Sequence, residues 1–262
     1  MKLVFKILML LFLTAYFVVV LGFVRKQYDG VLCNGMEIVV RDSLERVLVT
    51  SADVKNLLRL DHPEPAGMPV SEIDMAGIEE SLNDFPAISN AQVYANVQGR
   101  LIVELSQRSP VLRIEDRNHQ HYYLDAEGYV IPANFDYTPH VLHINGEIPG
   151  KYRKEKRIMV TGASPGENGH TLMGDVLKMG RYIHEHPFWR SQIVQIYVRK
   201  NGEFELIPRV GSQIIYFGSA ERMENKFFKL ITLYQEGFTH TGWNQYEIIN
   251  LKYTNQVICT KR

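Results

Sequence analysis

The sequence predicts an α+β protein with one N-terminal transmembrane helix, a small β-α-α-β-β domain, and a mainly antiparallel β domain with flanking helices. Three observations predict it: an apolar run near the N-terminus, the element order over residues 35–108, and strand signals that recur over residues 109–262. With 262 residues, the chain is long enough for one or two hydrophobic cores. Its 45% apolar and 22% charged residues are typical of a folded protein.

The apolar run extends over residues 7–24 and is interrupted only by Thr14, Tyr16 and Gly22. A membrane span needs roughly 20 mostly apolar residues, so we expect a transmembrane anchor over residues 7–26. The alternative is a cleaved signal peptide, which has a shorter apolar core and a cleavage site of small residues. The residues after the run offer no such site, which favours the uncleaved anchor.

The charges that flank this run orient it. Lys2, Lys6 and the terminal amine lie before the run, while Arg25 and Lys26 follow it. This narrow excess of positive charge favours residues 1–6 as a short cytoplasmic N-terminus. We therefore expect residues 35–108 and 109–262, the working part of the protein, on the other side of the membrane.

Residues 35–108 carry the signals of five elements. A strand is expected over residues 36–40, and Thr50 and Asp53 have the spacing of a capping box before a helix over 51–60. A proline-containing loop separates it from a second helix, which is expected to start near 71–74 and to end at Pro86. Strands over 91–97 and 100–105 follow, with Gly99 as a hairpin turn signal.

Residues 109–262 alternate between short strands and two amphipathic helices. Strands are expected over residues 111–114, 122–124, 129–131, 193–198, 204–207, 214–217 and 246–258. The helices are expected over 172–186 and 220–236, where apolar residues recur at helical spacing. Strand runs interrupted by helices favour a domain built on an antiparallel sheet.

The chain shows no catalytic motif, and no catalytic residue, metal ion, cofactor or small-molecule substrate is expected. Two His-x-His pairs, His119 with His121 and His184 with His186, could share a metal, but neither has a third ligand nearby in the sequence. Asp125 and Glu127 could be paired acids, although a turn before a strand explains them better.

Charge and cysteine content exclude further classes. Lys plus Arg equals Asp plus Glu at 29 each, which gives no general attraction to nucleic acid. Cys33 and Cys259 do not make a disulfide framework. The densest basic run, residues 151–157, could touch lipid headgroups, but a solvated surface segment is the simpler interpretation.

The last strand-like stretch, residues 246–258, lies close to the chain end. A terminal strand often lies at a sheet edge, where a partner strand can pair with its free backbone groups. The alternative is a strand covered on both sides, and the sequence leaves both open.

Several motifs together resemble the FtsQ/DivIB family of bacterial cell-division proteins over essentially the whole chain. They are the anchor, a β-α-α-β-β unit that resembles a POTRA domain, and four short motifs. These motifs are Arg108-Ser-Pro-Val111, Tyr123-Leu-Asp-Ala-Glu-Gly128 with Val130-Ile-Pro132, a turn like that of Pro139–Gly146, and Ile249-Asn-Leu-Lys-Tyr-Thr-Asn-Gln-Val-Ile258.

The resemblance implies a non-enzymatic scaffold of the inner membrane that links early and late division proteins at the division site. It implies recruitment through the POTRA-like unit and strand addition at the C-terminal sheet edge by FtsB-like and FtsL-like coiled-coil membrane proteins. Carried onto this chain, the partner-binding residues are Lys252, Tyr253, Asn255, Gln256, Val257 and Ile258. Recruitment through the short N-terminus is not expected, and neither is a contribution to the partner contact from a tail after Arg262.

Two other functions stay open at this point. One is a membrane-tethered cell-envelope enzyme, whose only support is the scattered His and acidic residues. The other is a POTRA-type assembly factor, although such proteins usually carry tandem POTRA units and this sequence shows one.

Overall fold

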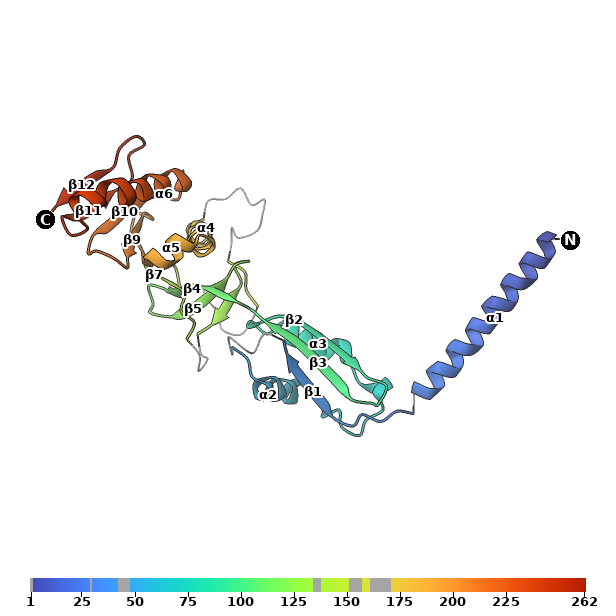
Figure 1. Cartoon of the computed structure of the whole chain (residues 1–262). Helices are drawn as coiled ribbons and strands as arrows, with labels where there is room; N and C mark the ends of the chain where they lie inside the picture. The colour runs from blue at the N-terminus through green and yellow to red at the C-terminus, as the bar shows by residue number, and fades with distance from the viewer. Residues whose placement is uncertain (1, 29, 42–47, 134–137, 151–156, 161–170) are drawn as a thin grey trace. The chain divides into compact units, whose positions relative to one another are not determined.

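The structure is a computed structural model that describes residues 2–28, 30–41, 48–133, 138–150, 157–160 and 171–262. Its contacts divide the chain into a first unit, residues 1–84 with 88–107, and a second unit, residues 85–87 with 108–262 (Figure 1). The predicted basic run, apart from Arg157, lies outside the described residues.

Residues Lys2–Tyr28 form helix α1. Among the residues that the structure describes, no helix meets both the length and the apolarity required to cross a membrane. The anchor over residues 7–26 is therefore not confirmed and stays a prediction.

The remainder of the first unit has the predicted element order. Its elements are β1 (Met36–Val40), α2 (Ser51–Asp61), the 3-10 turn η1 (Val70–Glu72), α3 (Met75–Asn83), β2 (Ile88–Ala95) and β3 (Leu101–Gln107). The sheet order is β1-β3-β2, with β1 parallel and β2 antiparallel to β3 (Figure 1). Helices α2 and α3 bury Val54, Leu58, Ile78 and Leu82.

Local capping fixes where both helices begin. Thr50 Oγ1 accepts a hydrogen bond from Asp53 N at 3.2 Å, and Asp53 Oδ2 accepts one from Thr50 N at 2.8 Å, which confirms the predicted capping box. The second helix begins at Met75, later than predicted, because Asp74 is its N-cap and accepts from Gly77 N at 2.9 Å.

The second unit is built on one nine-stranded mixed sheet of order β12-β11-β10-β9-β8-β7-β4-β5-β6. Its strands are β4 (Pro110–Glu115), β5 (His121–Asp125), β6 (Val130–Pro132), β7 (Leu142–Gly146), β8 (Ile193–Val198), β9 (Phe204–Pro208), β10 (Ile214–Gly218), β11 (Tyr246–Asn250) and β12 (Ile258–Lys261). Five of the eight described strand pairs are antiparallel, so the mainly antiparallel prediction holds. The α+β class is confirmed.

The helices of this unit are α4 (Leu172–Glu185), α5 (Pro187–Gln192), α6 (Met223–Thr232), the π-turn η2 (Leu233–Gly237) and α7 (Phe238–Thr241). Helix α4 agrees with the helix predicted over 172–186, while the helix predicted over 220–236 divides into α6 and η2. Both pack on the sheet, and Val176, Phe227 and Leu230 join its buried core.

Candidate functional site at the edge of the second sheet

The C-terminal stretch is not the single strand predicted over residues 246–258. Strand β11 ends at Asn250, a turn follows, and β12 begins at Ile258. The Asn250 side chain causes the break, because its Oδ1 accepts from Lys252 N at 3.0 Å and so turns the backbone. Five of the six predicted binding residues lie in this turn, and Ile258 alone lies in a strand.

Strand β12 forms one edge of the sheet, which is one of the two arrangements that the sequence left open for the last strand. It pairs antiparallel with β11, and Arg262 N donates to Gln245 O at 3.2 Å on that side. Because the direction of successive amides alternates, the amides of Ile258 and Thr260 also point toward β11. The backbone groups of Cys259 and Lys261 therefore point outward, where a further strand could pair.

Cations from α6 and from its N-cap residue, Arg222, hold the turn in place. Lys229 Nζ donates to the carbonyl oxygens of Leu251 and Tyr253, and Arg222 Nη1 donates to Thr254 Oγ1 at 3.0 Å. Lys252 forms an ion pair with Glu203, and this hydrogen bond lowers the pKa of the Glu203 carboxyl. These contacts leave the turn in one defined position beside the edge strand.

An open groove of about 490 Å³ lies between this turn and the end of α6. Its walls are Phe228, Lys229, Thr232, Leu233, Glu236, Gly237, Asn255, Gln256 and Val257. Three of the predicted binding residues thus line the groove. The other wall comes from α6 and η2, which the sequence did not single out. A π-turn is rare and often marks a functional site, but it has no local sequence signal.

Large apolar side chains are exposed around this groove and edge. Phe228 is 70% exposed, Tyr253 48% and Ile258 42%. By contrast, Trp243 and Tyr246 are partly buried and pack on Phe238 of the core at ring distances of 5.2 and 5.8 Å. The site therefore combines free backbone groups, an apolar groove and exposed aromatic side chains, which are typical of a protein-binding surface.

The histidines of the two predicted pairs that the structure describes lie as follows. His119 Nδ1 lies 2.9 Å from Glu115 Oε1, and His143 Nε2 lies 3.7 Å from Glu115 Oε2. His186 lies at the C-terminal end of α4 and stacks on Tyr182. Within the described parts of the chain, no group of three or more His, Cys, Asp or Glu side chains could hold a metal ion.

Asp125 and Glu127 are not a catalytic pair. Asp125 is 2% exposed and its Oδ2 lies 2.6 Å from Arg108 Nη1, whereas Glu127 is exposed. Gly128 N donates to Asp125 O at 3.2 Å, which confirms the turn. Cys33 and Cys259 are both free thiols, and burial raises the pKa of Cys259.

Comparison with known families identifies both units. A model described as FtsQ/DivIB, C-terminal related, matches residues 109–260, which is more than half of the chain. The chain belongs to the FtsQ/DivIB family. A model of the POTRA-like domain matches residues 31–106 of this FtsQ/DivIB protein. A search of curated proteins finds no match.

Membership in the FtsQ/DivIB family makes this a cell-division protein. The family is not a known family of enzymes. The matched region of the C-terminal model includes α6, η2 and the turn, and it ends inside β12. The groove and the outward-facing edge thus lie in the region that carries the family signal.

Proposed function

We propose that this protein is a bitopic scaffold of the bacterial division machinery that links early and late division proteins and is needed for septum formation. In this proposal residues 7–26 anchor it in the cytoplasmic membrane at the division site, with residues 1–6 in the cytoplasm and both folded units outside. The apolar run of residues 7–24 and the flanking charges support the anchor.

The open edge of β12 beside the apolar groove is the observation that carries the proposal. A strand from a partner pairs with the outward backbone groups of Cys259 and Lys261. An apolar face of the same partner then covers Phe228 and fills the groove. The FtsB-like coiled-coil protein, together with its FtsL-like companion, is the proposed partner.

The six residues predicted from the sequence have different parts in this contact. Lys252 is already paired with Glu203, so it positions the turn. Asn255, Gln256 and Val257 form the groove wall, while the exposed side chains of Tyr253 and Ile258 offer apolar contact.

Two substitutions test the contact by co-purification with the FtsB-like protein of the same bacterium. Lys261→Pro removes an outward amide without removing a bond to β11, and Phe228→Ala empties the groove wall. We expect each to weaken binding by about tenfold or more, since a central aromatic anchor contributes about 2 kcal/mol. Val97→Ala is the matched control, because Val97 is 81% exposed in the other unit.

Binding that is unchanged in both variants would exclude this surface. The scaffold role itself is tested by depletion in the source bacterium, where normal septation and cell length would refute it. A reporter fused after Arg262 tests the orientation, and activity of that reporter in the cytoplasm would contradict the proposed topology.

A further inference from the structure

The two edges of the POTRA-like sheet differ, and β2 is the closed one. Ala91 N donates to Asn83 Oδ1 at 3.0 Å, and Val93 N donates to Glu79 Oε2 at 3.0 Å. Both acceptors belong to α3, so side chains of this helix take up two of the outward amides of β2. A strand that approached this edge would have to displace both bonds, which disfavours pairing there.

Strand β1 is the open edge. Leu101 N donates to Gly35 O and Arg41 N donates to Leu105 O, each at 3.0 Å, so odd-numbered residues of β1 face β3. By alternation, the backbone groups of Met36, Ile38 and Val40 point outward. Within the described residues, no other strand pairs with this side of β1. The side chains of these three residues are only half-buried, which leaves apolar surface beside the edge.

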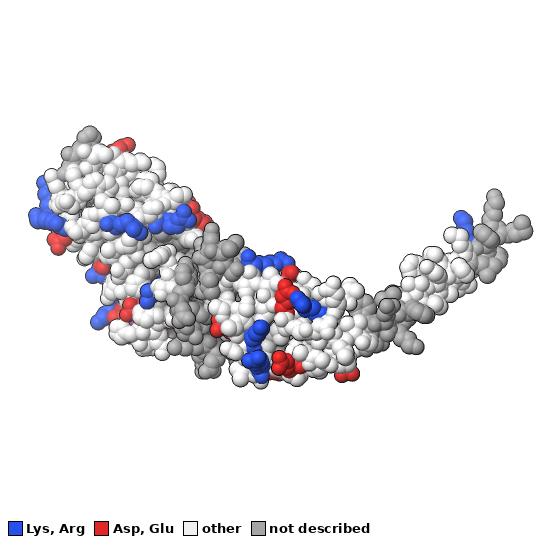
Figure 2. All heavy atoms as spheres, turned by 60° about the horizontal axis from the view of Figure 1, so that its bottom comes forward, with Lys and Arg blue, Asp and Glu red and all other residues white. Residues whose placement is uncertain are grey.

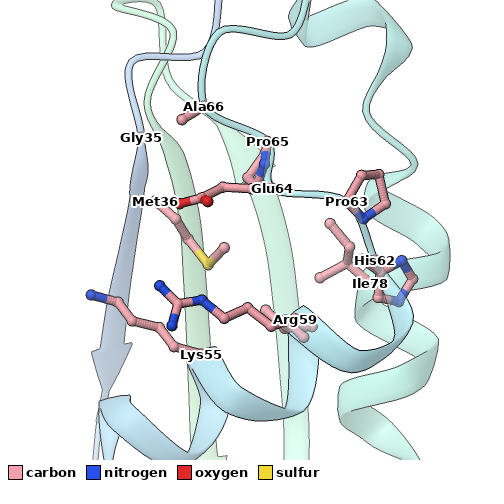
Figure 3. A pocket seen from close by; sticks show the side chains of 11 residues that line it. Gly35, Met36, Lys55, Arg59, His62, Pro63, Glu64, Pro65, Ala66 and Ile78 are labelled. Atoms are coloured by element: carbon pink, nitrogen blue, oxygen red, sulfur yellow. The ribbon is translucent and has the colours of Figure 1, made fainter.

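A pocket of about 140 Å³ lies next to this edge (Figure 3). Met36 from β1, Leu58 from α2 and Ile78 from α3 supply its apolar lining. Leu58 and Ile78 are each 4% exposed, so the floor of the pocket is part of the packed core.

One wall of the pocket is cationic. Lys55 and Arg59 lie one helical turn apart on α2, and Figure 3 shows both side chains extending along the same side of the pocket. In the part of the chain that the structure describes, neither forms an ion pair. Glu64 lies on the opposite loop, and His62 Nε2 is bonded to Ser81 Oγ at 2.9 Å. The face shown in Figure 2 carries both charge signs.

We propose that the β1 edge and this pocket bind an extended, acidic and apolar segment of a second division protein. The segment pairs with the outward groups of Met36, Ile38 and Val40 and places a carboxylate beside Lys55 and Arg59. An apolar side chain of the segment enters the pocket. β1 begins eight residues after α1 ends, a reach of at most about 28 Å. With α1 as the proposed anchor, the bound segment belongs to the membrane-proximal part of that protein.

A peptide in which Glu alternates with Val and Thr is the probe, and the same peptide with Lys in place of Glu is its counterpart. Fluorescence anisotropy measures binding to the full chain in detergent micelles. We expect the Glu peptide to bind roughly tenfold more tightly than the Lys peptide. Lys55 and Arg59 attract the Glu side chains and repel the Lys side chains, and both cations are exposed. Lys55→Glu with Arg59→Glu should reverse this preference.

The matched control is Arg117→Glu with Lys200→Glu, which reverses two exposed charges of the second unit. This control should leave the preference for the Glu peptide unchanged. Ile38→Pro is an independent variant, since it removes an outward amide and no bond to β3; it should abolish binding of the Glu peptide. Circular dichroism checks that each variant keeps its helix content.

Hydrogen exchange then separates this edge from the one at β12. The Glu peptide should slow exchange at Met36, Ile38 and Val40 and leave Ala91 and Val93 unchanged. Lys261→Pro should not alter this protection. The experiment therefore distinguishes a refuted β1 proposal from a refuted partner contact at β12. Three results would overturn the proposal. They are equal binding of both peptides, no effect of the charge reversal at Lys55 and Arg59, and protection from exchange at residues 258–261 in place of 36–40.

Discussion

Replacing one partner of the buried pair between Arg108 and Asp125 should destabilise the second unit strongly. Arg108 and Asp125 side chains are each 3% exposed, and the Arg108 guanidinium lies 3.8 Å from the centroid of the Tyr129 ring. Asp125 Oδ1 also accepts from Tyr129 N at 2.7 Å. One carboxylate therefore neutralises the arginine and fixes the turn that precedes β6.

The magnitude follows from what each substitution leaves behind. Asp125→Asn keeps an acceptor for Tyr129 N but leaves a buried guanidinium without a counter-charge, which costs about 3–5 kcal/mol. Among the described residues, Nε and Nη2 of Arg108 already have no hydrogen-bond partner, so the loss of the Asp125 charge is not offset by an acceptor at these atoms. Arg108→Met leaves Asp125 unpaired at a similar cost. In the double variant neither charge remains, so its cost should fall short of the sum by about 2–3 kcal/mol.

Chemical denaturation followed by tryptophan fluorescence measures these costs. Both tryptophans, Trp189 and Trp243, lie in the second unit, so the signal reports that unit alone. A matched surface control is Glu127→Gln, which changes an exposed carboxyl of the same turn. Additive costs of the two single variants, or single costs no larger than that of Glu127→Gln, would refute the assignment of a coupled buried pair.

Three further predictions concern both units. Burial lowers the pKa of His143 below its usual 6.5. As the pH falls through about 6.5, His143 therefore takes up a proton in the unfolded chain before it does so in the folded protein, and the stability of the fold should decrease. His143→Gln should flatten this pH dependence in denaturation curves. Gly146→Ala should cost about 2 kcal/mol or more, because φ is 108° and the new Cβ would lie 2.2 Å from Val198 O; thermal unfolding measures the loss. Gln107→Met should speed exchange of the Leu48 and Val49 amides, since Gln107 Oε1 accepts from both, at a cost of about 2–4 kcal/mol.

Features set by local sequence were predictable, and features set by distant pairing were not. The capping box at Thr50 and Asp53 depends on four consecutive residues, so its pattern was readable. Strand β7 was missed because it pairs in parallel with β4 and β8, which come from far along the chain. The sequence motif around Pro139–Gly146 indicated only a turn.

The candidate site shows the same division. Proximity to the chain end made an edge strand one of two alternatives, and β12 lies at an edge. The pattern could not reveal that the side chain of Asn250 ends β11, because apolar and β-branched residues continue on both sides of the turn. Phe228 was not predicted as a binding residue. The apolar pattern indicated that Phe227 and Leu230 face the core, and an exposed apolar neighbour is not unusual on an amphipathic helix.

Each sheet has one edge that is closed and one that is open, and this asymmetry connects the two proposals. At the far end of the second sheet, Val130 N of β6 donates to Ile158 O at 2.8 Å and Val160 N donates to Gly128 O at 3.0 Å, so residues 158–160 cover that edge. In the first sheet, Asn83 and Glu79 of α3 do the same for β2.

Free strand edges promote aggregation, so a protein that closes two edges and leaves two others open has reason to use the open ones. The edges at β1 and β12 have different surroundings, because one lies beside the cations Lys55 and Arg59 and the other beside the exposed ring of Phe228. The two edges therefore suit partners of different character. We expect Ile38→Pro to abolish binding of the Glu peptide alone and Lys261→Pro to weaken binding of the FtsB-like protein alone. Loss of both partners from either single substitution would contradict two independent edges.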